Sequence, residues 1–177
     1  MLVAIATIVK HYAAMSTPSK KIPSTNPPGS HPVLTLERYL PYRLSILSNR
    51  ISGRIAETYG DKFALSITEW RIMAVLGEYP GISADEVSIK TQIEKSMLSR
   101  AISKLLSRHL VARGFYPDDR RRSMLSLTDT GQSVYDEIVP VARQMEQELL
   151  DCFSVEEQAA FSELVDRLYR HAGELPR

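Results

Sequence analysis

The sequence predicts a mainly helical protein that carries one small β-hairpin. Apolar residues recur every three or four positions along several stretches, which is the spacing of an amphipathic helix. The pattern Ser-x-x-Glu, a capping box that begins helices, occurs before three of these stretches, at Ser66, Ser83 and Ser154. Between residues 110 and 127 the pattern instead indicates two short strands joined by a polar turn.

The composition is that of an ordinary globular protein, with 44% hydrophobic and 24% charged residues among 177. The net charge is only +1, so any nucleic-acid signal must come from local clustering. One cysteine excludes an intramolecular disulfide and a cysteine-based zinc cage, and the four histidines lack ligand spacing. Apolar runs fall short of the ~20 residues that span a bilayer. We therefore expect a cytoplasmic protein with no metal, no cofactor and no membrane contact.

Residues 1–33 are predicted to form a disordered extension before a single domain over residues 34–177. The part that follows Met15 is rich in proline and polar residues and cannot build a core. The apolar run Leu2–Val9 has two interpretations: a weak export or membrane signal, or a leading segment upstream of a true translation start at Met15. An intact Met1 terminus in mass spectrometry would contradict the second.

A continuous apolar stripe predicts a helix over residues 40–60, with Pro41 in its first turn. Arg43, Arg50 and Arg54 on this helix either face solvent or bind an anionic ligand or a partner subunit, since arginine suits carboxylate and phosphate. The next capped helix holds the lone Trp70, which is either a core residue or a wall of a ligand pocket.

Two helices joined by a turn are predicted over residues 83–90 and 94–108. The second has an apolar side that includes Met97 and Leu98, and we expect that side to be buried. Its other side carries serines and cations instead of the Glu–Lys pairs of a merely solvated face. Small polar side chains let a helix approach a DNA groove closely. The predicted contacts from this helix are Lys95, Ser96, Ser99, Arg100, Ser103 and Lys104.

Positive charge gathers on this helix and the hairpin. From Lys90 to Arg122, nine Lys and Arg residues oppose three Asp and Glu residues, which gives +6, so the rest of the chain is net acidic by about five. Such asymmetry is typical of a duplex-binding surface. The expected hairpin tip could reach a minor groove, with Asp119 placed to orient Arg121. The predicted contacts from the tip are Asp119, Arg120, Arg121 and Arg122. The pattern over residues 66–127 therefore predicts a winged helix-turn-helix.

This stretch resembles the MarR family of winged helix-turn-helix regulators. The matching segments are Ser66–Arg71, Ser99-Arg100, Leu105–Arg113, Asp119–Arg121 and Leu127–Gly131. The resemblance covers roughly residues 40–172. It implies that Ser96, Ser99 and Arg100 read the major groove and that Arg121, supported by Asp119, enters the minor groove. The chain departs from the family at His109, where a glycine usually ends the recognition helix in a left-handed conformation.

Residues 40–45, with Arg50 and the pair Trp70-Arg71, are similar to the MarR-family regulators that respond to aromatic acids or their coenzyme A thioesters. This similarity implies a small anionic aromatic effector or its coenzyme A thioester. The residues that would bind it are Tyr42, Arg43, Arg50, Trp70 and Arg71. The redox-sensing branch would need a cysteine near the start of the first long helix, whereas Cys152 is expected on a late helix, packed and inert.

Residues 128–172 are predicted to form two further helices, the first capped by Thr128 and interrupted by Pro140. With residues 40–60 they carry more apolar surface than the winged module can bury, which predicts a homodimer. Two recognition helices one DNA turn apart would then require a palindromic operator.

We interpret the chain as a sequence-specific DNA-binding regulator and a ligand-released repressor. The sequence offers no metal cluster, phosphate loop or nucleophile–base pair, so we do not expect an enzyme or catalytic residues. The alternative is a winged-helix protein-interaction module, which would expose apolar residues where this chain has arginines and serines.

Overall fold

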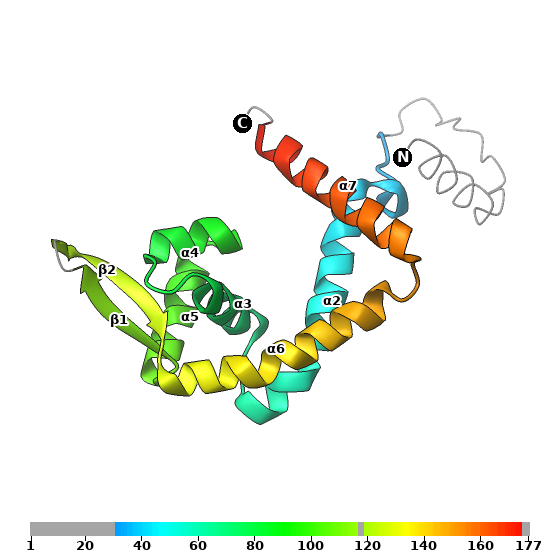
Figure 1. The fold of residues 1–177 in the computed structure, drawn as a ribbon. Helices are drawn as coiled ribbons and strands as arrows, with labels where there is room; N and C mark the ends of the chain where they lie inside the picture. Colours follow the sequence, from blue (N-terminus) through cyan, green and yellow to red (C-terminus); the bar gives the residue numbers. More distant parts are fainter. Residues whose placement is uncertain (1–30, 117–118, 175–177) are drawn as a thin grey trace. The chain divides into compact units, whose positions relative to one another are not determined.

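The computed structural model describes residues 31–116 and 119–174 (Figure 1). They divide between two compact units, one spanning Thr35–Met145 and the other holding the residues on either side of it. Helices and one two-stranded antiparallel sheet make up the regular structure of these residues, which confirms the predicted fold class. Among the described residues, no helix is both long enough and apolar enough to cross a membrane.

The unit of residues 35–145 begins with a short 3-10 helix that the sequence did not predict. Its elements in chain order are η1 (Leu36–Arg38), α2 (Leu40–Phe63), α3 (Ile67–Glu78), α4 (Ala84–Thr91), α5 (Lys95–Ser107), β1 (Val111–Tyr116), β2 (Asp119–Leu127) and α6 (Asp129–Leu150), of which α6 runs past Met145. Helix α7 (Val155–Glu174) belongs to the other unit.

Helix starts follow the capping signals closely. The Ser66 backbone N–H donates to Glu69 Oε2 over 2.7 Å, and the Glu69 N–H donates to Ser66 Oγ over 3.2 Å. The same reciprocal pair forms at Ser83 and at Ser154. Helix α6 is continuous around Pro140, so the proline does not divide it into two helices, and the kink expected there stays a prediction.

The core lies inside the winged module. Ile72, Met73, Val87 and Leu105, from α3, α4 and α5, have no exposed surface. Met97 was predicted to join this core but is 50% exposed. The reason is helical geometry: Met97 lies seven residues, about two turns, before Lys104 and shares its exposed side.

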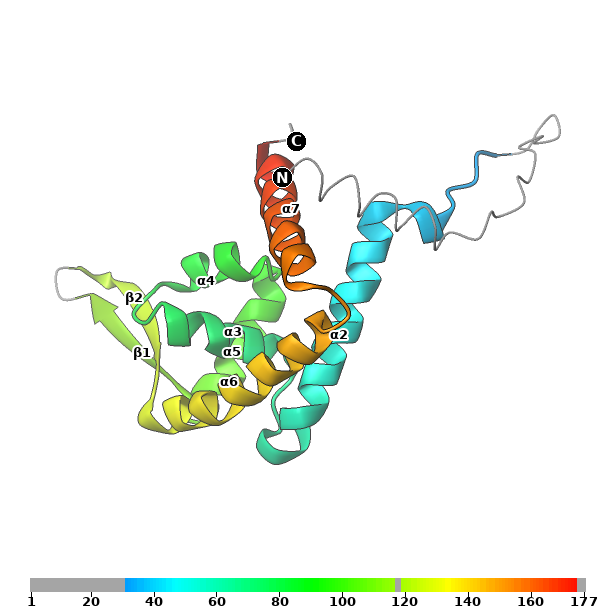
Figure 2. The same cartoon turned by 45° about the vertical axis from the view of Figure 1, so that its right-hand side comes forward.

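The hairpin pairs Val111 with Leu127 through Phe115 with Ser123, and an irregularity follows before Tyr116 pairs with Asp119. A further bridge joins Ile82 to Leu125, so the loop before α4 is bonded to the hairpin. No local pattern predicted this bridge, which anchors the base of the hairpin. Both views show the hairpin extending beyond α4 and α5 (Figures 1 and 2).

The predicted arginine-rich tip needs one correction. Residues 120–122 belong to strand β2, which begins at Asp119. They lie at the irregularity between the pairs Phe115–Ser123 and Tyr116–Asp119, so the pairing resumes for one further pair beyond them. Residues 117–118 and the side chains of Asp119, Arg120, Arg121 and Arg122 lie outside the described part of the chain.

Candidate nucleic-acid interface

Helix α5 separates its residues cleanly into two sides. Leu98, Ala101, Ile102 and Leu105 are buried against the core. The six predicted DNA contacts of this helix are all exposed, and they are Lys95, Ser96, Ser99, Arg100, Ser103 and Lys104. We call these six residues the α5 face. The structure therefore brings every predicted contact from this helix onto one surface.

The N-terminus of α5 is capped by Glu94. Its carboxylate accepts from the backbone N–H of Ser96 at 3.0 Å and of Met97 at 3.2 Å, and from the Ser96 hydroxyl. These hydrogen bonds, led by that of the hydroxyl, hold the pKa of Glu94 below its usual value. Because the Ser96 hydroxyl donates to Glu94, its oxygen remains available as a hydrogen-bond acceptor.

The cations of the α5 face are held loosely. Lys95 Nζ lies 3.5 Å from Asp85 Oδ1, and both side chains are 82% exposed, so this ion pair contributes little. Arg100 Nε donates to the Ser96 carbonyl over 3.3 Å. An incoming phosphate or base edge could therefore recruit these side chains at small cost.

The end of α5 adopts the left-handed conformation that usually requires glycine. His109 has φ of 56°, its N–H donates to the Leu106 carbonyl, and the Leu110 N–H donates to the Leu105 carbonyl, both over 3.0 Å. This pair of bonds is a Schellman motif. Histidine thus occupies the left-handed position at some conformational cost, and helix α5 still ends there.

The start of α6 is fitted closely to the end of α5. Thr128 Oγ1 donates to the His109 carbonyl over 2.6 Å and accepts from the Gly131 N–H over 3.0 Å. A Cβ atom on Gly131 would lie 1.9 Å from the Leu110 carbonyl oxygen, closer than atoms can approach. The run Thr128–Gly131 therefore has a physical explanation, which is a threonine cap and a glycine where two backbones meet.

The model of the MarR family matches residues 65–123, from the start of α3 through the helix-turn-helix and into β2. Over this stretch the chain is similar to the MarR family. Transcriptional regulator HosA from Escherichia coli O111:H- is 27% identical over 104 residues, which cover 59% of this chain and 77% of that protein.

Solved structures agree with this assignment. A MarR/EmrR family transcriptional regulator from Acinetobacter sp. ADP1 superposes with a TM-score of 0.73 and 25% identity, over 80% of this chain and 100% of that chain. A MarR-family regulator from Silicibacter pomeroyi gives a TM-score of 0.65 and 28% identity, over 75% and 89%. These proteins are transcriptional regulators, in agreement with the prediction that the chain is not an enzyme.

Two of the predicted effector residues contact helix α2. Arg71 Nη2 donates to Ser52 Oγ over 3.0 Å. The half-buried Trp70 stacks at a tilt between Tyr59 and Tyr135, with ring centroids 5.7 and 5.9 Å away. Burial raises the pKa of Tyr59 to about 12, against a smaller opposite effect of Arg71. Ser52 and both tyrosines were not predicted, because their contacts join segments that are distant in sequence.

The remaining predicted effector residues lie exposed on α2. Tyr42 precedes Ser52 by ten residues, or about 15 Å along a helix axis, so the structure does not place Tyr42 and Arg43 beside Arg71. Arg50 is only two residues from Ser52 and is also exposed. Among the described residues, no group of three or more His, Cys, Asp or Glu could hold a metal ion. Cys152, predicted to be packed on a helix, is exposed in the turn after α6.

Proposed function

We propose that this protein is a sequence-specific DNA-binding repressor. It binds a palindromic operator as a homodimer and is released by a small anionic aromatic effector or its coenzyme A thioester. The observation that carries the proposal is the α5 face: an exposed row of serines and cations on a helix whose opposite side is locked into the core. Such a face suits a polyanion that presents hydrogen-bonding edges.

In the proposed complex the α5 face enters the major groove. Ser96 offers an acceptor, Arg100 offers donors that suit guanine, and Lys104 neutralises a phosphate. Met97 adds an apolar surface beside these cations, which suits the methyl group of thymine. Arg120, Arg121 and Arg122, with Asp119 supporting Arg121, are proposed to reach the minor groove from the hairpin.

The homodimer would bury apolar faces that one chain leaves open. On α7 the residues Phe161, Leu164, Val165 and Leu168 form a stripe at helical spacing and are 41–49% exposed. The first turns of α2 present Leu40, Leu44 and Leu47 in the same manner. A second copy would cover each face, and it would supply the second recognition helix that a palindromic site requires.

The effector is proposed to bind near Arg71, with Trp70 as an aromatic wall and with Arg50 and the more distant Tyr42 and Arg43 as further contacts. A guanidinium beside an aromatic ring suits a carboxylate or thioester phosphates on an aromatic body. The effector would release the operator by binding better to a dimer in which the two recognition helices no longer match successive major grooves. It can shift this equilibrium only by its difference in affinity for the two arrangements.

The experiment is selection of bound sequences from random duplexes, followed by affinity measurements against salt concentration. We expect a palindromic consensus and an affinity that falls steeply with salt. Arg100→Ala and Arg121→Ala should each weaken operator binding by ~1–3 kcal/mol, while Lys104→Ala should weaken binding similarly on all sequences. If no duplex is enriched and binding does not respond to salt, the protein-interaction module replaces this proposal.

The effector is tested on the same complex. Aromatic acids and their coenzyme A thioesters are added to the preformed operator complex, and release is followed by fluorescence anisotropy. Arg71→Met should raise the concentration needed for release without changing effector-free operator affinity. Equal release of the variant and the native protein would remove Arg71 from the site.

A further inference from the structure

We propose that Arg108 is a positioning residue for DNA binding. It ties the end of the recognition helix α5 to the C-terminus of α2, so that the orientation of α5 follows the position of α2. This inference rests on the proposed DNA-binding function, because it explains how the α5 face is held for the groove.

The contact is a two-pronged hydrogen bond between segments 44 and 45 residues apart in sequence. Arg108 Nη1 donates to the Ala64 carbonyl over 3.0 Å, and Nη2 donates to the Phe63 carbonyl. These carbonyls lie at the end of α2, where a helix has no intrahelical donors left and carries partial negative charge. One planar guanidinium satisfies both, which an ammonium cannot do in the same geometry.

Arg108 is also the residue that ends α5. Its own N–H donates to the Lys104 carbonyl over 3.1 Å, and the next residue is the left-handed His109, whose carbonyl accepts from Thr128 at the start of α6. Two consecutive residues, Arg108 and His109, therefore join the end of α5 to α2 on one side and to α6 on the other.

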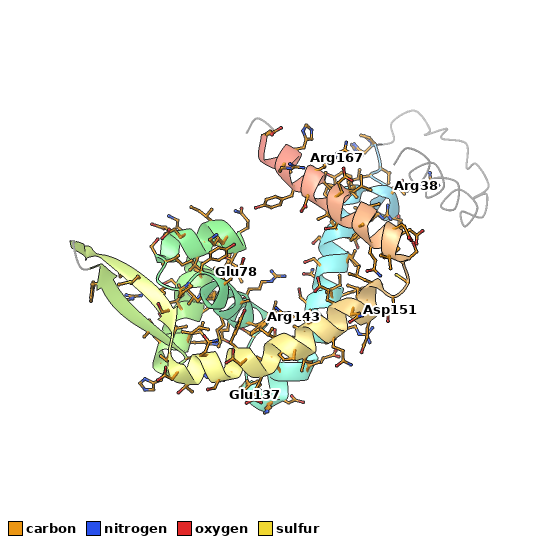
Figure 3. The ribbon with its side chains drawn as sticks, in the orientation of Figure 1. Arg38, Glu78, Glu137, Arg143, Asp151 and Arg167 are labelled. Carbon is orange, nitrogen blue, oxygen red and sulfur yellow. The ribbon has the colours of Figure 1, made fainter. Side chains whose placement is uncertain are left out.

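An ion pair also connects α2 directly to α6. Lys62, in the last turn of α2, contacts Glu137 of α6, which Figure 3 labels beside the last turns of α2. Both partners are more than half exposed, so this pair is weak by itself. The guanidinium fork is the stronger connection, because hydrogen bonds to charged groups are worth more than neutral ones. A displacement of α2 against the winged module would have to pull on Arg108.

The rival role for Arg108 is a simple phosphate contact, since it belongs to the positive cluster from Lys90 to Arg122. The two roles predict different behaviour. A phosphate contact needs only charge, whereas the connection to α2 needs the fork geometry. Arg108→Lys keeps the charge and loses the fork. Arg108→Gln loses both, and Lys104→Gln, on the α5 face, is the matched loss of an exposed cation.

The first readout is binding of the full-length protein to the selected operator and to an unrelated duplex. We expect Arg108→Lys to weaken operator binding about tenfold, the value of one hydrogen bond to a charged group, with no change on unrelated DNA. Arg108→Gln should weaken it at least as much with the salt slope unchanged, while Lys104→Gln should reduce the slope by about one. Native-like operator binding by Arg108→Lys, with a reduced slope for Arg108→Gln, would overturn the proposal in favour of the phosphate contact.

The second readout needs no DNA. Spin labels at Glu57→Cys on α2 and Ser103→Cys on α5, in a Cys152→Ser background and diluted with unlabelled chain, report the α2–α5 distance by pulsed electron resonance. Arg108→Lys and Arg108→Gln should broaden the distance distribution, and Lys104→Gln should leave it unchanged. An unchanged width in both Arg108 variants would overturn the positioning role. Because this readout is independent of DNA, a failure of the proposed function would show separately, as absence of operator binding by the native protein.

Discussion

Helices α5 and α7 are both amphipathic, but the apolar side of α5 is buried in the chain whereas that of α7 is exposed. Helix α5 buries Leu98, Ala101, Ile102 and Leu105 within its own chain and is left with a polar, cationic face. Of the α7 side chains that the structure describes, none is buried, and the apolar stripe itself is the exposed surface. The same periodicity therefore leaves two different exposed surfaces. The one on α5 is polar and cationic, and we propose that it binds DNA. The one on α7 is apolar, and we propose that a second copy of the chain covers it.

The largest expected effect comes from breaking the α7 stripe. Leu164→Lys combined with Leu168→Lys should convert the proposed dimer to a monomer, since charges cannot be buried in an apolar interface. Operator affinity should then fall by about 10²-fold or more, because the two recognition helices are no longer linked. Sedimentation and operator titration measure the two effects.

A matched variant adds the same charge to the opposite side of the same helix, by Ala159→Lys combined with Ser162→Lys. It should leave both the assembly state and the affinity near native values. If the stripe variant stays dimeric and binds operator normally, α7 does not contribute to dimerisation.

The next effect tests the close fit at the end of α5. Gly131→Ala places a Cβ against the Leu110 carbonyl oxygen, at 1.9 Å if nothing moves, and that neighbour is backbone rather than a flexible side chain. We expect a loss of roughly 1–3 kcal/mol in the free energy of unfolding, as in other overpacked sites. Thermal and urea unfolding measure it.

Gly53→Ala is the control, because a Cβ on Gly53 of α2 would meet nothing within 4 Å. This change should instead stabilise the protein by roughly 0.5–1 kcal/mol, the usual gain from replacing glycine in a helix. Equal effects of the two substitutions would mean that the Leu110 contact is not limiting.

The sequence predicted local features well and long-range ones poorly. Capping boxes at Ser66, Ser83 and Ser154 act within four residues, so each was readable. The special conformation of His109 was visible as a departure from the MarR family pattern. By contrast, the fork from Arg108 to α2 and the bridge between Ile82 and Leu125 join segments more than forty residues apart, and no local pattern encodes them.

Met97 shows where periodicity alone misled. It extends the apolar row of α5 by one position, but its angle around the helix places it with Lys104, on the exposed side. A residue at the edge of an apolar stripe can be either buried or exposed. Met97 is such a residue, and it borders the α5 face.

That position gives a more delicate test of the α5 face. If Met97 contacts a thymine methyl group, replacing that thymine with uracil should weaken binding about fourfold, near the value of one buried methyl group. The loss should disappear in Met97→Ala, whereas Ser99→Ala should remain sensitive to uracil. Titration of a series of single-uracil operators measures this. Uracil sensitivity that persists in Met97→Ala at every position would assign the methyl contact elsewhere.

The smallest expected effect is on the pH dependence of stability, and it contrasts a tyrosine in the unit of residues 35–145 with one on α7. Tyr59 is buried and its pKa is raised from 10.0 to about 12, whereas Tyr169 of α7 is 74% exposed. Between these pH values the unfolded chain has released the Tyr59 proton and the folded chain still holds it, so the unfolded state binds fewer protons and stability falls as pH rises. Urea unfolding from pH 8 to 11.5 should show this fall in native protein and in Tyr169→Phe, and a shallower one in Tyr59→Phe. If Tyr59→Phe keeps the native slope, the alkaline loss of stability originates in another group.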